Sequence, residues 1–351
     1  MIFLFAVAAL VVGGGVAYVA SEDVRYLARA GIEETRILSE ARPIARIVAD
    51  PGTAPDLRST LQLVLDARDF AAAIGFEAKE TYTTYTDVGR DTLLLVLQAA
   101  PRDCICPVTW KWPIVGSMPY KGFFDARAGE RAAAELASRG YDVHLRPSGA
   151  FSTLGWFNDP LLSTAMSRDP VELVSTVFHE IAHNSLYVRS ATPFNESFAQ
   201  MAGYRAAEAF FRSRGDTLLA GRAADRFHDE QVLGAYYAEL IARLDSAYAR
   251  GYEGAALDSV RTAEGRWARE QLAGPVGARL RTIRITPQPE RPVNNARLIG
   301  ITLYRTRLDL FDAWYRRHGE DIGKAVAELR RLVEGAEGDE AFQRLEAALG
   351  K

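Results

Sequence analysis

Two histidines four positions apart, His179 and His183, constrain this chain more than any other feature of its sequence. A helix brings positions i and i+4 to the same face, so both imidazoles can reach one metal ion. Glu180 follows the first histidine, where a carboxylate can hold and deprotonate a metal-bound water. The pattern His179-Glu180-Ile181-Ala182-His183 therefore predicts a zinc site on a helix.

The residues before this pattern predict the start of that helix. Asp169 is a favourable N-cap, Pro170 suits the first helical position, and Glu172 completes a capping-box spacing. The apolar side of the helix then comprises residues spaced by four, Leu173, Val177 and Ile181.

A catalytic zinc site needs a third protein ligand and an open fourth position, and Glu196 is the candidate ligand. It lies near the start of a second predicted helix, which opens with Thr-Pro at 192–193 and continues through an apolar-rich run. Ala199 is small, so we expect the two helices to approach each other closely there. Asn195 and Gln200 are expected to support the ligands from behind, Gln200 by orienting a histidine through its carbonyl oxygen.

Further segments accompany these two helices along the chain. They are Arg42-Pro43-Ile44, Trp112-Pro113-Ile114, Pro119-Tyr120-Lys121-Gly122-Phe123-Phe124, Phe151-Ser152-Thr153-Leu154-Gly155-Trp156-Phe157 with Asp159-Pro160, Phe178-His179-Glu180-Ile181-Ala182-His183, Leu186-Tyr187-Val188, Phe194-Asn195-Glu196-Ser197-Phe198-Ala199 and Asn294-Asn295-Ala296. With these segments the chain resembles a bacterial family, the putative aminopeptidases. The resemblance implies a zinc peptidase of the gluzincin type, whose ligands are two histidines and a glutamate. Lys111 and Ser117 stand where many relatives have cysteines, so the resemblance implies no disulfide between these two positions.

The middle of the chain, residues 77–165, predicts a mixture of strands and helices. Residues 81–86 and 93–97 are rich in strand-forming side chains, and residues 141–145 alternate like a strand. Residues 126–139 predict a helix that ends at a glycine.

Peptidases of the gluzincin type place a strand along the rim of the cleft, where its backbone pairs with an extended substrate. The resemblance points to residues 149–155 for this strand. Its candidate substrate-binding residues are Gly149, Phe151, Ser152 and Thr153. An ordinary core strand is the alternative interpretation.

Helical periodicity dominates the remaining sequence, including a long helix near 232–248, a second near 256–272, and one opened by Asn294-Asn295. The first two are expected to form a projecting hairpin or a surface for self-association. We therefore predict an α+β fold, predominantly helical, with a zincin-like metallopeptidase core, a small β region and a helical C-terminal part. The predicted divisions are an N-terminal segment 1–21 and one peptidase domain 22–351, which comprises helical 22–76, mixed 77–165, zinc-site helices 166–215 and a helical part 216–351.

Residues 2–20 are uncharged and almost entirely apolar, which is near the length that crosses a bilayer. A retained membrane anchor is favoured over a cleaved signal peptide, for which residues 15–17 are the small-residue cleavage site. Either interpretation places the remainder of the chain outside the cytoplasm, membrane-anchored or periplasmic. The net charge of −3 argues against nucleic acid as a main partner.

The two cysteines and three isolated histidines are interpreted as non-functional. Cys104 and Cys106 are two positions apart, so they could form only a strained bond, and no second pair is available for structural zinc. His144, His228 and His318 are expected at the surface, with His228 inside a charged, solvated run, 225–230.

The predicted activity is zinc-dependent peptide-bond hydrolysis, most consistent with an extracytoplasmic aminopeptidase. Glu180 would deprotonate the zinc-bound water and then protonate the leaving amine. Tyr304, on the helix opened by Asn294-Asn295, is the candidate donor to the oxyanion, ahead of Tyr187. Asp159 is one candidate for binding a free substrate amine, although it suits a turn equally well.

Three alternatives share the same ligands. The protein could be a membrane-tethered endopeptidase, an amidase, or an inactive zinc-containing binding module. Glu180 argues against the last, because a purely structural zinc site needs no base beside its first ligand. The sequence leaves the natural substrate and the oligomeric state open.

Overall fold

The computed structural model describes residues 22–112, 116–149, 160–286, 289 and 291–351. Over these residues the chain is α+β and mostly helical, as the sequence predicts. No helix in these ranges combines the length and apolarity needed to cross a membrane. The apolar segment 2–20 lies outside the described residues.

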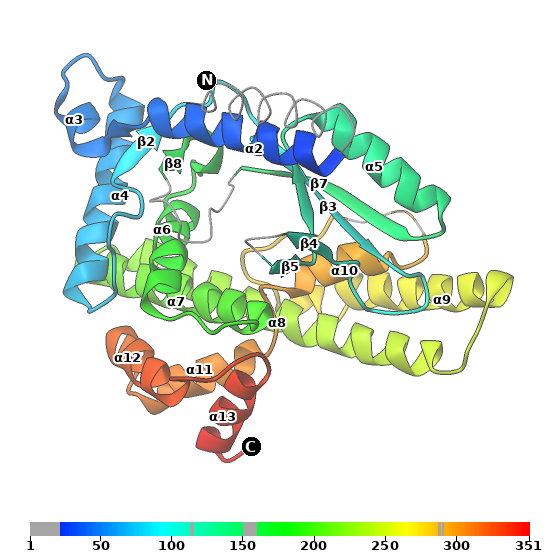
Figure 1. The fold of residues 1–351 in the computed structure, drawn as a ribbon. Helices are drawn as coiled ribbons and strands as arrows, with labels where there is room; N and C mark the ends of the chain where they lie inside the picture. Colours follow the sequence, from blue (N-terminus) through cyan, green and yellow to red (C-terminus); the bar gives the residue numbers. More distant parts are fainter. Residues whose placement is uncertain (1–21, 113–115, 150–159, 287–288, 290) are drawn as a thin grey trace, which may run out of the picture.

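Three helices begin the described chain, and the first connects two small sheets (Figure 1). They are α2 (Glu22–Ser39), α3 (Ile44–Ala49) and α4 (Pro55–Ala73). The Tyr26 ring of α2 contacts Phe123, with 6.0 Å between ring centroids. Near the other end of α2, the Ile37 carbonyl oxygen accepts a hydrogen bond from Thr86 Oγ1 at 3.0 Å. Helix α2 therefore contacts one strand of each sheet.

The strands form three small sheets. They are β1 (Arg42–Pro43), β2 (Thr84–Thr86) and β8 (Leu161–Leu162) in the order β1-β2-β8, β3 (Leu94–Ala100), β6 (Lys121–Phe123) and β7 (Asp142–Ser148) in the order β6-β3-β7, and the pair β4 (Trp110–Trp112) and β5 (Gly116–Met118). The central strand β3 is nearly all buried and pairs antiparallel with both neighbours. Lys111 and Ser117 pair directly across β4 and β5. Strands predicted at 81–86, 93–97 and 141–145 are therefore present with shifted ends.

Helix α5 (Ala126–Ser138) packs on the sheet β6-β3-β7 (Figure 1). Asp125 caps its first turn by accepting a hydrogen bond from the Ala128 N–H. The helix ends before Gly140, whose φ of +85° is a left-handed conformation that glycine adopts without steric cost. The helix predicted at 126–139 is confirmed.

The central pair of helices is α6 (Pro170–Ser185) and α7 (Thr192–Ser213), which pack side by side (Figure 1). Asp169 Oδ1 accepts the Val171 N–H at 2.9 Å, as the predicted N-cap requires. The expected capping box does not form, because the Glu172 side chain turns away to bind Arg226 and Tyr204. Apolar side chains of both helices enter the main core, including Val177, Phe178, Ile181, Phe194 and Phe198.

Helices continue to the C-terminus. They are α8 (Thr217–Tyr248), α9 (Gly254–Ala273), α10 (Asn295–Thr302), α11 (Leu308–Arg317), α12 (Ile322–Leu332) and α13 (Glu340–Leu349), with short 3-10 turns at Ser163–Ala165 and Gly277–Arg279. The ends of α8 and α9 form the expected projecting hairpin (Figure 1). The helix predicted after Asn294-Asn295 is divided into α10 and α11, since Arg307 adopts a left-handed conformation between them.

The charged run 225–230 is solvated only in part, because Asp229 and Glu230 are buried whereas the Asp225 side chain is exposed. Asp229 is fully buried, and its carboxylate accepts hydrogen bonds from the backbone N–H groups of Arg281, Thr282 and Ile283 at 2.7–2.9 Å. Glu230 is also buried, with Oε2 2.7 Å from Arg305 Nε. Asp229 therefore anchors the loop 281–283 to α8, since these donors satisfy its buried carboxylate.

The three isolated histidines are half-buried rather than surface residues. His144 lies within β7. His228 Nε2 is 3.2 Å from the Arg279 carbonyl oxygen. His318 packs on the Trp314 ring, with 4.3 Å between ring centroids. His318 packs within α11 and its C-cap, whereas His228 joins α8 to the 3-10 turn Gly277–Arg279.

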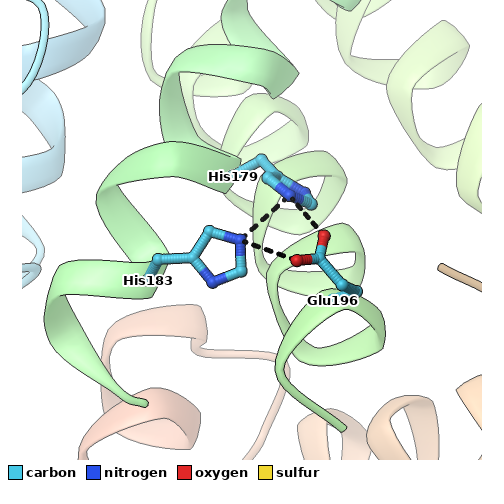
Figure 2. Close-up of side chains that lie close together, drawn as sticks. All are labelled: His179, His183 and Glu196. Carbon is cyan, nitrogen blue, oxygen red and sulfur yellow. Dashed lines mark hydrogen bonds and ion pairs between the residues drawn. The ribbon is translucent and has the colours of Figure 1, made fainter. Parts of the chain in front are cut away.

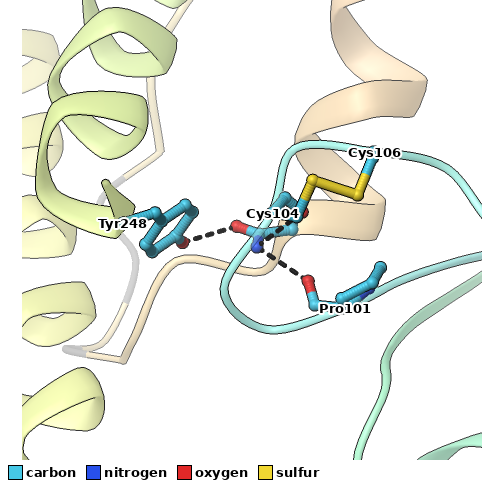
Figure 3. Close-up of a disulfide and its surroundings, with 5 residues drawn as sticks. Pro101, Cys104, Cys106 and Tyr248 are labelled. Atoms are coloured by element: carbon cyan, nitrogen blue, oxygen red, sulfur yellow. Dashed lines mark hydrogen bonds between the residues drawn. A yellow bond between two sulfur atoms is a disulfide. The ribbon is translucent and has the colours of Figure 1, made fainter. Parts of the chain in front are cut away.

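Cys104 and Cys106 form a disulfide in the loop between β3 and β4 (Figure 3). Asn295 Nδ2 donates to the carbonyl oxygens of Pro101 and Cys104, at 2.9 and 3.2 Å. The Asn295 Oδ1 accepts from the Tyr248 hydroxyl at 2.9 Å. The first residue of α10 therefore binds the disulfide loop to α8, a role that the sequence did not reveal.

Candidate functional site

Three side chains from α6 and α7 converge between the two helices (Figure 2). His179 Nε2 lies 3.2 Å from His183 Nε2 and 3.5 Å from Glu196 Oε2. His183 Nε2 lies 3.9 Å from Glu196 Oε1. The two histidines share one face of α6, and Glu196 is the fifth residue of α7. The loop 186–191 turns the chain so that Glu196 faces them.

These three residues fit a zinc ion. Tetrahedral zinc with ligands at about 2.0–2.1 Å separates neighbouring ligand atoms by roughly 3.3 Å. The two histidine nitrogens are 3.2 Å apart, close to that value, and each lies 3.5–3.9 Å from one of the two Glu196 oxygens. With one ligand atom taken from each residue, all three atoms lie within 4.8 Å of one another. Two imidazoles and one carboxylate are also a donor set that zinc commonly binds. The side chains remain 13–23 % exposed, so a fourth partner could approach from solvent.

Electrostatics favour the protonation states that bind a cation at His183 and Glu196, but not at His179, whose pKa is raised. Burial, reinforced by neighbouring His179, lowers the pKa of His183 to about 4, so its ring is neutral near pH 7. Burial raises the pKa of Glu196, but hydrogen bonds from His179 and Tyr304 outweigh it and lower the pKa overall. Burial likewise lowers the pKa of His179, while the carboxylates of Glu196 and Glu180 raise it overall. Glu196 is therefore an anion beside His179.

A glycine fixes how closely the two helices approach. A β-carbon at Gly203 on α7 would lie 2.7 Å from the Ser175 carbonyl oxygen and 3.4 Å from His179 Cβ. The expected close approach therefore occurs one turn beyond Ala199. The His179 ring hydrogen-bonds the backbone of Ala199, and this bond favours the protonated ring, as a carbonyl acceptor does. That contact supports the histidine in the way expected of Gln200, whose side chain instead lines a cleft.

Asn195 supports the loop between the two helices. It is buried, its Nδ2 donates to the Val188 carbonyl oxygen at 2.7 Å, and its Oδ1 accepts the Val188 N–H at 2.9 Å. Both hydrogen bonds hold the chain between α6 and α7. Both join the Asn195 side chain to Val188, so its support of the zinc ligands stays a prediction.

Tyr304 lies in the turn after α10, two residues beyond the end of the helix on which it was predicted. Its ring is 5.9 Å from the His179 ring, centroid to centroid. Burial and the Glu196 carboxylate raise its pKa, so its hydroxyl remains a donor across the physiological range. Burial and the same carboxylate raise the pKa of Tyr120 to about 12. Tyr187, by contrast, is 64 % exposed.

A cleft of about 280 Å³ opens beside Glu180. It is lined by Glu172, Ser175, Thr176, His179, Glu180, Gln200, Gly203, Tyr204 and Tyr304. Burial raises the pKa of Glu172, an effect that Arg226 opposes. The possible base, one histidine and Tyr304 therefore border the same space. Among the other polar lining residues, the sequence pointed to Glu172 as part of a helix cap and to Gln200 as a support of a histidine, but not to Ser175, Thr176 or Tyr204.

The predicted substrate strand lies mostly outside the described residues, which include Gly149 but not 151–153 or Asp159. Strand β7 ends at Ser148. The Gly149 carbonyl oxygen accepts a hydrogen bond from Thr164 Oγ1 at 2.6 Å. Gly149 therefore packs against the 3-10 turn before α6.

Comparison with known proteins identifies a family for this chain. No curated protein and no solved structure gives a significant match to the chain. One family model matches residues 25–345, which is most of the sequence. By this match the chain belongs to the family described as “Putative aminopeptidase”.

Proposed function

We propose that this protein is a zinc-dependent aminopeptidase. The observation that carries the proposal is the convergence of His179, His183 and Glu196 on one point beside Glu180. The family description supports a peptidase that acts at amino termini. The apolar residues 2–20 support a membrane-anchored or extracytoplasmic location.

In this proposal His179, His183 and Glu196 would hold the zinc ion. When bound, zinc would make water more acidic and polarise a substrate carbonyl. Glu180 takes a proton from the attacking water and passes it to the leaving amine. The Tyr304 hydroxyl donates to the oxygen on which negative charge develops.

The variant Glu180→Gln tests this function directly. Glutamine fills the same space without a proton-accepting carboxylate, so the variant should fold, keep its zinc, and hydrolyse peptides at least about 10²–10⁴-fold more slowly. Glu239→Gln, an exposed carboxylate on α8, is the matched control and should retain wild-type activity. Equal activity of the Glu180 variant and wild type would refute Glu180 as the base.

The substrates should include peptides with free and acetylated amino termini. A requirement for the free amine supports an aminopeptidase, whereas equal cleavage supports the endopeptidase or amidase alternative. A zinc-containing wild-type protein that cleaves no substrate supports the binding-module alternative.

A further inference from the structure

The cleft beside Glu180 has polar walls and one unsatisfied hydroxyl. Ser175 is only 6 % exposed, and its Oγ has no hydrogen-bond partner among the described residues. Its neighbours in the lining, Thr176, Gln200 and Tyr204, also carry polar groups. Since buried hydroxyl groups are nearly always paired, the Ser175 hydroxyl points to a ligand that completes it.

The lining is also acidic. Glu172 and Glu180 supply two carboxylates, and no Lys or Arg side chain lines this cleft in the described chain. Arg226 Nε lies 2.8 Å from Glu172 Oε1, and the Tyr204 hydroxyl donates to Oε2 at 3.1 Å. A carboxylate offers about four acceptor positions, so Glu172 can accept further hydrogen bonds from within the cleft.

Spacing on α6 decides which cationic group can reach Glu172. Glu172 and Glu180 are eight residues apart on one helix, which is roughly 12 Å along its axis. The α-nitrogen of a substrate is only about 2.5 Å from its own carbonyl carbon. A carbonyl held near Glu180 therefore leaves the α-amine far from Glu172, while a lysine or arginine side chain carries its charge on a long stem.

We infer that this cleft binds a lysine or arginine side chain of the substrate, next to the bond that is cleaved. The inference rests on the proposed peptidase function. The ammonium or guanidinium group binds Glu172 and donates to the Ser175 hydroxyl, while the aliphatic stem passes Thr176 and Gly203. An uncharged side chain of equal length leaves the Glu172 carboxylate without this partner.

Two pairs of matched substrates test the inference on the zinc-loaded full-length protein. Lysine is compared with norleucine, and arginine with citrulline, on each side of the cleaved bond in turn. The basic member of each pair should have a kcat/KM about 10- to 100-fold higher, as expected for a charge-assisted contact. Cleavage of all peptides with equal efficiency would overturn the subsite and leave the peptidase function intact.

A binding measurement separates the subsite from turnover. Non-hydrolysable analogues with a reduced peptide bond would be titrated calorimetrically, with the lysine analogue binding at least about tenfold tighter than the norleucine analogue. Equal binding would overturn the inference even if no peptide is cleaved. The inference would also be overturned if the analogues bind equally well whatever their side chain but bind more weakly when the amino terminus is acetylated. That result would assign the cleft to the α-ammonium group.

Two variants attribute the preference to the cleft. Glu172→Gln should reduce the lysine-to-norleucine ratio to about threefold or less, and the exposed Glu239→Gln should leave it unchanged. Because Glu172→Gln also disturbs Arg226, Gln200→Glu provides a second test that adds a carboxylate to the lining. It should increase the ratio. An unchanged ratio in both cleft variants would contradict the assignment.

Discussion

Gly203 on α7 crosses Ser175 on α6 so closely that a β-carbon would lie 2.7 Å from the Ser175 carbonyl oxygen. Gly203→Ala must therefore push the two helices apart. Overpacking of this kind costs about 1–3 kcal/mol of unfolding free energy. Because His179 lies beside the crossing, we also expect weaker zinc binding. Urea denaturation and zinc titration measure the two effects.

Gly221→Ala on α8 is the matched control. No atom lies within 4 Å of a β-carbon built at Gly221, so alanine fits there. Since alanine favours a helix over glycine, this variant should be more stable by about 0.5–1 kcal/mol. Destabilisation by both substitutions would show that helix crossing is not the cause at Gly203.

The local signals in the sequence predicted the zinc-site helices well. Asp169, Pro170 and the apolar residues spaced by four define α6, because caps and periodicity act within one helix. Gly203 was not identified, since a glycine inside a helical pattern has no local signature of a close crossing. Its role depends on Ser175, 28 residues earlier in the chain.

The run 225–230 shows why other features could not be predicted. Its charges alternate as they do on a solvated helix face, yet Asp229 caps a loop more than 50 residues later. Likewise, nothing in the local sequence links Asn295 to the Cys104–Cys106 loop. Such contacts join residues that are far apart in the sequence, so local sequence patterns do not reveal them.

The site residues make a direct prediction about metal content. His183→Ala and Glu196→Ala each remove one of three converging groups. Zinc affinity should therefore fall by more than the roughly 10–100-fold lost when a residue that hydrogen-bonds a metal ligand is replaced. Elemental analysis after dialysis against a weak chelator measures the loss. His228→Ala, a histidine bound to a loop carbonyl, should keep full zinc content. Full occupancy in both site variants would exclude these ligands.

Asp229 makes stability depend on pH. Burial raises its pKa, but the N–H groups of Arg281, Thr282 and Ile283 outweigh burial and lower the pKa below its ordinary value of 3.8. The stabilisation by Asp229 is therefore complete from about one pH unit above 3.8, the pKa in the unfolded chain. It is lost as the pH falls through the lower pKa of the folded state. Asp229→Asn should cost about 1.5–3 kcal/mol at pH 7, and this difference from wild type should shrink below pH 3.8.

Asp225→Asn is the control for this effect. Asp225 contacts Arg281 at 2.7 Å, but both side chains are well exposed, so the substitution should cost less than about 1 kcal/mol. Denaturation of both variants between pH 3 and pH 7 gives the comparison. Equal losses at pH 7 would indicate that burial of Asp229 contributes nothing specific.

Tyr304→Phe decides whether this tyrosine acts on the substrate or on a ligand. Its hydroxyl hydrogen-bonds Glu196, so a purely positioning role predicts weaker zinc binding without a separate catalytic loss. A donor to the developing oxyanion predicts normal zinc content, a nearly unchanged KM, and a kcat about 10²–10³-fold lower. We expect the second result, because Tyr304 lines the same cleft as Glu180 and His179, where the substrate carbonyl would bind.

The exposed Tyr187→Phe is the comparison for this substitution, and we expect it to have near-wild-type kcat and zinc content. Zinc content and steady-state kinetics should be measured on the same preparations of both variants. A Tyr304 variant that loses zinc and activity in equal proportion would assign the hydroxyl to Glu196. A fully active, zinc-loaded variant would remove Tyr304 from the mechanism and direct attention to Tyr120, whose pKa the same carboxylate raises.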